Sequence, residues 1–489
     1  MKKNGIFLFA TILSIASLTS CSGGGVYQNY SPDRYSDETG KDGRYEEHEE
    51  LGFVNMSDTT EMYLSLDNSS YSYTDVRNYI NSGHEVPTSA VNIEEMLNYF
   101  QYDYEAESGV NITAEVSNCP WNSENLLETI AIYAPITGER LPSNITFLVD
   151  VSGSMSDDSR LGLFQNAFEV AMPYLQSYDK ISLVTYASGV KTILDGISGE
   201  NKTVLHDKVM NLSASGSTNG AGGIKQAYNV AKKNFIEGGI NHIFIVTDGD
   251  FNVGISSEEE LGKMVKANAN EGIYLSIFGV GMYNTRQSMI ETIKKNGEGN
   301  CYYLDSVAEG AKALEVALKG GMRVLTKDTK AKISFDPRYV SKFRVLGYEN
   351  KLLTSEEYED EDTNAGEIFE GYQVMIAFEL VPTEETGEEI STIEIKYKDF
   401  QTLEDKVINA TSKTSNSNNH QFASMVCEFG LILRKSAYKK DASINNIISR
   451  VEDLTSYINE DDSKKEFIEL VNKYKKVNND SHSGHYYNE

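Results

Sequence analysis

Apolar and polar residues alternate in three different ways along the chain, and each pattern predicts a different kind of structure. From Asn144 to about Met322, short continuous apolar runs alternate with stretches that carry apolar residues at helical spacing. Continuous apolar strands between amphipathic helices are typical of a mostly parallel sheet with helices on both faces. This stretch therefore predicts an α/β domain with a doubly wound sheet.

The individual elements of this domain follow from the same runs. Strands are predicted over residues 145–151, 181–187, 191–194, 242–247, 273–280 and 301–304. Helices are predicted over residues 161–175, 224–235, 257–269, 286–295 and 307–318. Ser257 and Glu260 form a capping box at the start of the third helix.

The regions on either side of this domain show other patterns. After residue 325, apolar residues recur at every second position, as in Val374, Ile376 and Phe378, which predicts an antiparallel β region. The last stretch predicts helices over 422–433, 444–458 and 467–474, followed by a polar, disordered tail from Asn478. Ahead of the α/β domain we expect helices over 71–80 and 93–100 and strands over 112–116 and 128–133.

The N-terminus has the features of a targeting segment. Two lysines precede an apolar stretch, residues 6–18, which is too short to span a bilayer as a mature helix. It ends in Leu18-Thr19-Ser20-Cys21, which resembles a bacterial lipobox, where the cysteine is lipidated and becomes the new N-terminus. We expect lipidation of Cys21; the alternative is an ordinary cleaved signal peptide. Residues 22–55 are predicted to form a flexible tether.

Charge and cysteine content narrow the classes of partner. The formal net charge is −29, from 44 basic and 73 acidic residues. This argues against nucleic-acid binding, which needs basic patches, and against docking on anionic lipid by charge. Cys119, Cys301 and Cys427 lie far apart without a CxxC pair, so we expect buried thiols.

Three short segments carry the candidate chemistry. They are Asp150-Val151-Ser152-Gly153-Ser154 after the first strand, Gly216-Ser217-Thr218-Asn219-Gly220 before a helix, and Thr247-Asp248-Gly249 at the end of a later strand. Because parallel strands end at the same edge of a sheet, we expect Asp150 and Asp248 to converge there.

The residue types in these segments indicate which metal would bind. Asp150 and Asp248 offer carboxylates, while Ser152, Ser154 and Thr218 offer hydroxyls that bind the ion directly or hold waters. Such hard oxygen donors favour Mg²⁺, Mn²⁺ or Ca²⁺ over zinc. Two carboxylates neutralise the ion without excess charge, so that an open position can accept an incoming carboxylate.

All five residues match the metal-ion-dependent adhesion site of von Willebrand factor A (vWA) domains, which the α/β stretch resembles over about 180 residues. This resemblance implies a Rossmann-like vWA fold, a protein partner that offers a Glu or Asp carboxylate, and no small-molecule cofactor. Asn219 and Asp250 lie next to the predicted ligands. We interpret them as residues that orient the ligands or, more simply, as turn residues.

The flanking regions resemble the bacterial YfbK-type vWA proteins. The similar segments are Tyr71-Ser72-Tyr73, residues 93–100, Cys119-Pro120-Trp121-Asn122, residues 247–254, 346–350, 365–368 and 429–434. The resemblance implies a vWA domain over 143–322, inserted in or flanked by an N-terminal domain (56–142), a C-terminal β module (323–405) and a helical segment (406–489). It also implies that β segments on both sides of the insertion pair with each other.

These observations favour a lipid-anchored binding protein of the bacterial cell envelope, at the outer membrane, rather than an enzyme. A structural envelope protein whose metal stiffens the loops is the first alternative. A metal-dependent hydrolase is the second, although the chain lacks a G-x-x-x-x-G-K-[ST] loop and a G-x-S-x-G elbow.

Overall fold

The computed structural model describes residues 49–66, 69–136, 140–218, 220–249, 258–281, 296–297, 299, 301–319, 323–361, 363 and 365–483. Cys21, most of the predicted tether, Ser257 and the helix predicted over 286–295 lie outside these residues. Within them, no helix combines the length and the apolar character needed to cross a bilayer.

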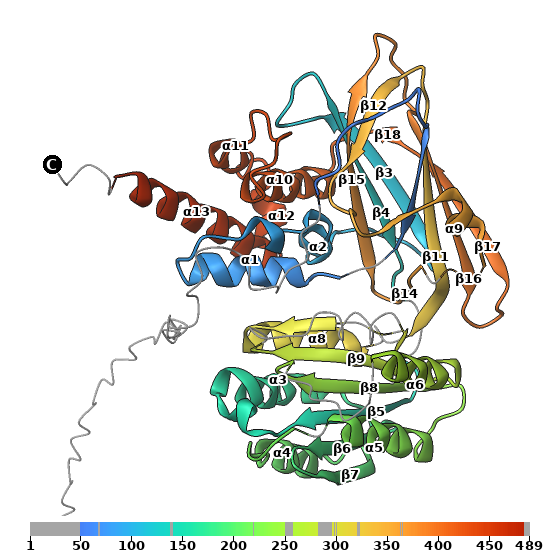
Figure 1. The fold of residues 1–489 in the computed structure, drawn as a ribbon, viewed down its shortest axis with the longest axis vertical. Coiled ribbons are helices and arrows are strands. Elements are labelled where there is room, and N and C mark those ends of the chain that lie inside the picture. The colour runs from blue at the N-terminus through green and yellow to red at the C-terminus, as the bar shows by residue number, and fades with distance from the viewer. Residues whose placement is uncertain are drawn as a thin grey trace, which may run out of the picture. The chain divides into compact units, whose positions relative to one another are not determined.

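The α/β domain is built on a sheet of strand order β10-β9-β8-β5-β6-β7, and Figure 1 shows β9, β8, β5, β6 and β7 following one another in this order. All neighbours are parallel except β6 and β7. Every residue of β5 and β8 is buried, which explains their continuous apolar runs. The bounds are β5 (Ser143–Asp150), β6 (Lys180–Tyr186), β7 (Val190–Ser198), β8 (Ile240–Thr247), β9 (Tyr274–Val280) and β10 (Cys301–Leu304).

Helices cover both faces of this sheet and form two separate cores. Phe147 and Val149 of β5 face one core, and Leu148 between them faces the other, because successive strand residues point to opposite faces. The first core includes α3 (Leu163–Ala171), α4 (Lys202–Met210) and α8 (Val307–Lys319); the second includes α5 (Gly220–Lys233) and α6 (Glu258–Asn270). The predicted doubly wound α/β fold is confirmed.

The flanking strands form a second module of two sheets. The first sheet has the order β1-β12-β15-β4-β3-β18; the second has the order β13-β2-β11-β16-β17, with β14 paired to β11. The bounds are β1 (Val54–Asn55), β2 (Glu61–Ser65), β3 (Asn111–Asn118), β4 (Leu126–Tyr133), β11 (Val324–Phe335), β12 (Val340–Val345), β13 (Leu352–Leu353), β14 (Ile368–Phe369), β15 (Gln373–Pro382), β16 (Ser391–Asp399), β17 (Asp405–Thr411) and β18 (Lys413–Thr414).

Strands from before and after the α/β domain pair directly in both sheets. β4 pairs with β15 over its whole length, and β2 pairs with β11, both antiparallel. β3 also pairs with β18, in parallel. The α/β domain is therefore inserted into the β module, as the resemblance implied. The β region runs to Thr414, past the predicted boundary at residue 405.

The chain crosses between the β module and the α/β domain twice. Main-chain hydrogen bonds tie both crossings to one short segment. Ala134, after β4, exchanges main-chain hydrogen bonds with Gly371 (2.8 Å) and Tyr372 (3.0 Å). Arg323, before β11, accepts one from Glu370 N–H at 3.0 Å. The entry to the α/β domain and the exit from it are thus tied to residues 370–372.

The interior of the β module is largely apolar, but it holds the buried carboxyl of Glu128. Apolar residues of both sheets, such as Ile130, Ile376 and Ile393, fill the space between them. Glu128 of β4 is fully buried and accepts a hydrogen bond from the Ser391 hydroxyl of the opposite sheet. Burial raises the pKa of Glu128 to about 8, and the Ser391 hydrogen bond offsets part of this rise.

Replacing Glu128 by Gln is expected to stabilise the protein above about pH 8. The pKa is about 8 when folded and 4.5 as the ordinary value, so the folded state holds a proton that the unfolded chain releases. The free energy of unfolding of the wild type therefore falls as pH rises between these values. E128Q should gain on the order of 5 kcal/mol above this range and little below about pH 4. Urea unfolding across pH measures this; an unchanged pH slope in E128Q would contradict it.

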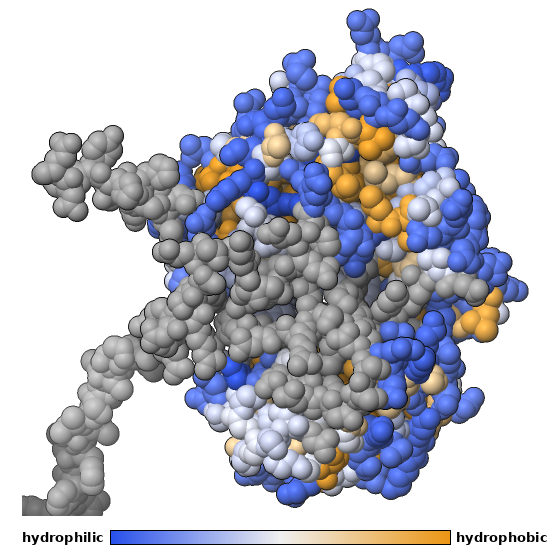
Figure 2. All heavy atoms as spheres, viewed as in Figure 1, coloured by the Kyte–Doolittle hydropathy of each residue, from blue (hydrophilic) through white to orange (hydrophobic). Residues whose placement is uncertain are grey.

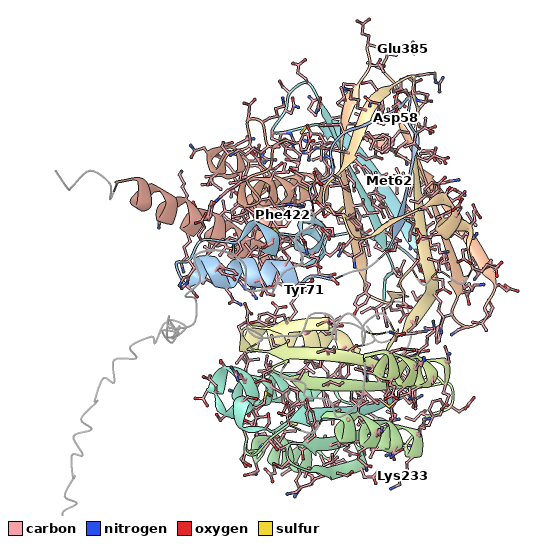
Figure 3. All side chains as sticks on the ribbon, viewed as in Figure 1. Asp58, Met62, Tyr71, Lys233, Glu385 and Phe422 are labelled. Atoms are coloured by element: carbon pink, nitrogen blue, oxygen red, sulfur yellow. The ribbon has the colours of Figure 1, made fainter. Side chains whose placement is uncertain are left out.

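A group of helices packs on the first sheet of the β module. Its members are α1 (Tyr71–Asn81), α2 (Ile93–Asn98), α10 (Asn418–Leu433), α11 (Ile444–Ser449), α12 (Thr455–Asn459) and α13 (Asp462–Ser483). A short helix, α9 (Ser355–Glu359), lies elsewhere, beside β2 and β13. Phe422, labelled in Figure 3, meets the rings of Phe100 and Phe467 at 5.0 and 5.5 Å.

Two predictions for the C-terminal helices were wrong. The single helix predicted over 444–458 is broken into α11 and α12, and at the break the Arg450 guanidinium pairs with Glu428 of α10. The tail was predicted to begin at Asn478, but helix α13 continues to Ser483.

In Figure 2 hydrophilic residues cover most of the visible described surface, and apolar ones gather in patches over the β module.

Candidate metal centre

The sheet places two of the predicted ligands side by side. Asp150 is the last residue of β5, and Asp248 directly follows the end of β8. The two strands are parallel neighbours in register, with Val149 opposite Val246. Both carboxylates are almost fully buried, and the charge of Asp248 acts on Asp150. The structure therefore places Asp150 and Asp248 next to each other at the sheet edge, as expected.

The loop after β5 turns sharply around its own carboxylate. The Ser152 N–H donates to Asp150 Oδ1 at 2.7 Å. The hydroxyls of Ser152 and Ser154 lie 3.0 Å apart. Adjacent oxygens around an octahedral Mg²⁺ with bonds of about 2.1 Å are also separated by about 3.0 Å. This spacing fits two neighbouring ligands of such an ion.

The second loop is joined to the first through its main chain. The Gly153 N–H donates to the Gly216 carbonyl at 2.9 Å. Gly216 has a φ of +86°, and a Cβ there would lie 2.5 Å from the Ser188 hydroxyl, so this position requires glycine. Thr218 follows two residues later, just before α5. Among the described residues, no hydrogen bond joins its hydroxyl to the other four predicted ligands.

At the third loop, Asp248 contacts Arg160, a residue that the sequence analysis did not identify. Gly249, at φ +85°, turns the chain after Asp248. Asp248 Oδ2 accepts a hydrogen bond at 2.9 Å from Nη1 of Arg160, which also donates to the Ser154 carbonyl. Arg160 lies in a π-helical turn (Asp158–Gly162) that follows the first loop. No motif signals it, because its role depends on where its long side chain points.

The chemistry of these groups fits a hard divalent cation. Within the part of the chain that the structure describes, no donor lies in hydrogen-bonding geometry to the buried Oδ2 of Asp150. Burial raises the pKa of Asp150 to about 6, although hydrogen bonding to Ser152 and Tyr186 lowers it, and the charge of Asp248 adds to the rise. An ion at this oxygen would compensate the buried charge. No group of three or more His, Cys, Asp or Glu in the described residues has metal-binding geometry, so a site here depends on hydroxyls as well.

Of the other residues considered for the site, two are not described by the structure and the rest lie elsewhere in the fold. Asn219 and Asp250 lie outside the described residues. His242 is in the core, stacked on Phe244 and hydrogen-bonded to Ser276 at 2.8 Å. Burial lowers the pKa of His242 to about 3, so it stays neutral, as expected for a core residue. Cys119 and Cys427 are buried thiols, as expected, whereas Cys301 is only partly buried.

Three family models match the chain in sequence order. One described as von Willebrand factor matches residues 39–128, and one described as von Willebrand factor type A domain matches residues 144–315. A third, described as Uncharacterized protein YfbK, C-terminal, matches residues 320–477. The boundaries of these matches follow the inserted α/β domain and its flanks.

The chain is also similar to individual relatives and solved structures. Uncharacterized protein YfbK of Escherichia coli (strain K12) is 33% identical over 438 residues, which is 83% of this chain and 76% of the relative. Inter-alpha-trypsin inhibitor heavy chain H2 of Sus scrofa is 26% identical over 160 residues, 31% of this chain and 17% of its own length. A von Willebrand factor type A structure from Catenulispora acidiphila covers 67% of this chain and 82% of its own at 14% identity and a TM-score of 0.38.

BatB from Bacteroides thetaiotaomicron covers 36% of this chain and 97% of its own at 20% identity and a TM-score of 0.30. The argument for family rests on the E. coli relative, whose similarity extends through the insertion and both flanks. The chain belongs to the YfbK-type family of von Willebrand factor A domain proteins.

Proposed function

We propose that this protein is a membrane-anchored binding protein of the bacterial cell envelope. It holds a divalent metal, Mg²⁺ or else Mn²⁺ or Ca²⁺, between the loops after β5, before α5 and after β8. The metal supplies an open coordination position for a Glu or Asp carboxylate of a protein partner. Asp150, Ser152, Ser154, Thr218 and Asp248 are the proposed ligands, with Asn219 and Asp250 beside them.

The observation that carries this proposal is the environment of Asp150. Its Oδ2 is buried and lacks a hydrogen bond of full geometry among the described residues, with the Tyr186 hydroxyl as the donor that acts on it, and it lies beside the second carboxylate and two hydroxyls at ligand spacing. A buried carboxylate without compensation is costly, and a cation removes that cost. Ser154 and Thr218 are only partly buried, so a partner can reach the ion from solvent.

The anchor is the second part of the proposal. Cys21 stands at the end of a short apolar segment in a lipobox-like tetrapeptide, and lipidation there would attach the protein to the outer membrane through the tether. Metabolic labelling with a palmitate analogue, wild type against Cys21→Ala, tests this. Label retained in the variant would exclude Cys21 as the anchor.

Replacing Asp150 by Asn tests whether the protein binds its partner through the metal. The amide keeps the shape of the side chain but removes the charge, so we expect at least a tenfold loss, roughly, of Mg²⁺ affinity. A pull-down from envelope extract should recover a partner with wild type plus Mg²⁺, and not with D150N or with chelator. Asp336→Asn, a partly exposed carboxylate of the β module paired with Arg338, is the matched control.

The outcomes separate the proposal from its alternative. Partner capture that persists in excess chelator would mean that the partner does not bind through the metal. A large Mg²⁺-dependent rise in Tm, with no partner recovered, would instead support a metal that only stiffens the loops.

A further inference from the structure

The Arg160 side chain lies inside the group of proposed ligands. One nitrogen, Nη1, contacts both the Asp248 carboxylate at 2.9 Å and the Ser154 carbonyl. The side chains of Arg160 and Asp248 are 15% and 4% exposed. This ion pair is therefore largely shielded from water, where such pairs are stronger than at the surface.

The surrounding chain directs Arg160 into this position. Its π-helical turn is capped by Asp157, whose Oδ1 accepts hydrogen bonds from the N–H and the hydroxyl of Ser159 at 2.8 and 2.7 Å. Gly281, after β9, leaves the space through which the arginine passes. A Cβ at Gly281 would lie 2.8 Å from both Cγ and Nε of Arg160. Two independent features of the fold thus accommodate the extended side chain.

We propose that Arg160 is a tethered competitor of the divalent metal: its guanidinium neutralises Asp248 in one state of the loops and must leave when the metal takes that carboxylate. The inference rests on the proposed function of the same site. Asp248 Oδ2 cannot give the same lone pair to the guanidinium and to an ion or its bound water. A doubly charged ion also repels a guanidinium a few ångströms away.

Competition of this kind sets the metal concentration at which the site loads. The arginine-paired state is stable by itself, because Asp248 has a counter-charge in it. The apparent metal affinity is then reduced by the fraction of molecules in that state. Removing the guanidinium should therefore tighten metal binding, whereas removing a residue that merely supports the loop should weaken it.

The test is a titration of the full chain with Mn²⁺ by calorimetry. Arg160→Met keeps most of the apolar length of the side chain and removes the charge. We expect its Kd for Mn²⁺ to be at least about fivefold lower than that of the wild type. Arg338→Met, which breaks an exposed Arg–Asp pair in the β module, is the matched control and should leave the Kd unchanged.

A second variant guards against misfolding of the first. Arg160→Lys keeps the charge but cannot reproduce the planar donor geometry, so it should tighten binding less than R160M does. In chelator, R160M should have a lower Tm than the wild type, because two buried carboxylates then lack a counter-charge. Its Mg²⁺-induced rise in Tm should be larger than that of the wild type.

Each outcome decides between the two proposals. If wild type and R338M bind Mn²⁺ while R160M binds equally or more weakly, Arg160 is a structural part of the loop and the competition is wrong. If none of the variants binds Mn²⁺, the proposed metal site itself fails and this inference fails with it. If only the Arg160 variants bind, competition is supported in its strongest form.

Discussion

Replacing Arg344 by Met is expected to lower the free energy of unfolding by about 3–5 kcal/mol, the usual cost of breaking a buried ion pair. Arg344 of β12 and Glu379 of β15 are both 1% exposed, and Nη2 lies 2.6 Å from the carboxylate. Glu379 also accepts hydrogen bonds from Trp121 Nε1 at 3.2 Å and Asn125 Nδ2 at 2.6 Å. The variant would leave that carboxylate buried without its cation.

Urea unfolding followed by fluorescence measures this directly, because Trp121 is the single tryptophan of the chain and contacts Glu379. Arg338→Met should cost less than about 1 kcal/mol, since its ion pair is exposed. The double variant R344M/E379Q should recover part of the loss, because the amide needs no counter-charge. A loss below about 1 kcal/mol in R344M would contradict a role for this pair in stability.

Replacing Arg77 by Met is expected to cost about 3 kcal/mol and to loosen the α/β domain from its neighbours. Arg77 of α1 donates to Asp305, which follows β10, at 2.6 and 2.8 Å and to Glu466 of α13 at 2.8 Å. It also pairs with Glu309 of α8 at 3.5 Å. One guanidinium therefore joins carboxylates of the inserted domain to the helices packed on the β module.

The pH dependence distinguishes this charge effect from loss of packing. Burial raises the pKa of Asp305 and of Glu466 even with Arg77 present. Without Arg77 both pKa values rise further, so the folded state binds more protons than the unfolded chain over a wider range. Its stability then falls as pH rises, and the deficit of R77M should be larger at about pH 8 than at about pH 5.

Calorimetry at both pH values measures the deficit. Lys435→Met, which breaks an exposed ion pair with Glu85, is the control and should change little at either pH. A deficit in R77M that is equal at both pH values would indicate lost packing rather than uncompensated carboxylates.

Most strands of the inserted domain could be predicted because β5, β6, β8 and β9 are buried almost throughout, which leaves continuous apolar runs. The same logic predicted that Asp150 and Asp248 meet, since parallel strands end at one edge. Helix α4 was missed because only Leu205 and Val209 of its nine residues are buried. Strand β17 was missed because it alternates between exposed and half-buried positions and has no buried residue.

Sequence patterns could not predict the contacts between segments that lie far apart along the chain. The placement of Arg160 at Asp248 depends on a side-chain direction and on the space beside Gly281. The roles proposed for Asp150, Ser152, Ser154, Thr218 and Asp248 as metal ligands, for Asn219 and Asp250 beside them, and for Cys21 as the lipidated residue all stay predictions. The broken helix at Arg450 depends on an ion pair with Glu428, and helical periodicity continues across it unchanged.

The tie at residues 370–372 has a consequence for biosynthesis. The α/β domain is complete once residue 319 has emerged, and all the strands of its sheet lie within 143–304. Strand β4, however, cannot pair with β15 until that strand has been synthesised, more than two hundred residues later. The nascent chain therefore carries an early apolar hairpin, β3–β4, that has no partner sheet while the middle of the protein already folds. The topology therefore leaves this hairpin without its partner strand until β15 has been synthesised, and such a partly folded chain is prone to aggregation.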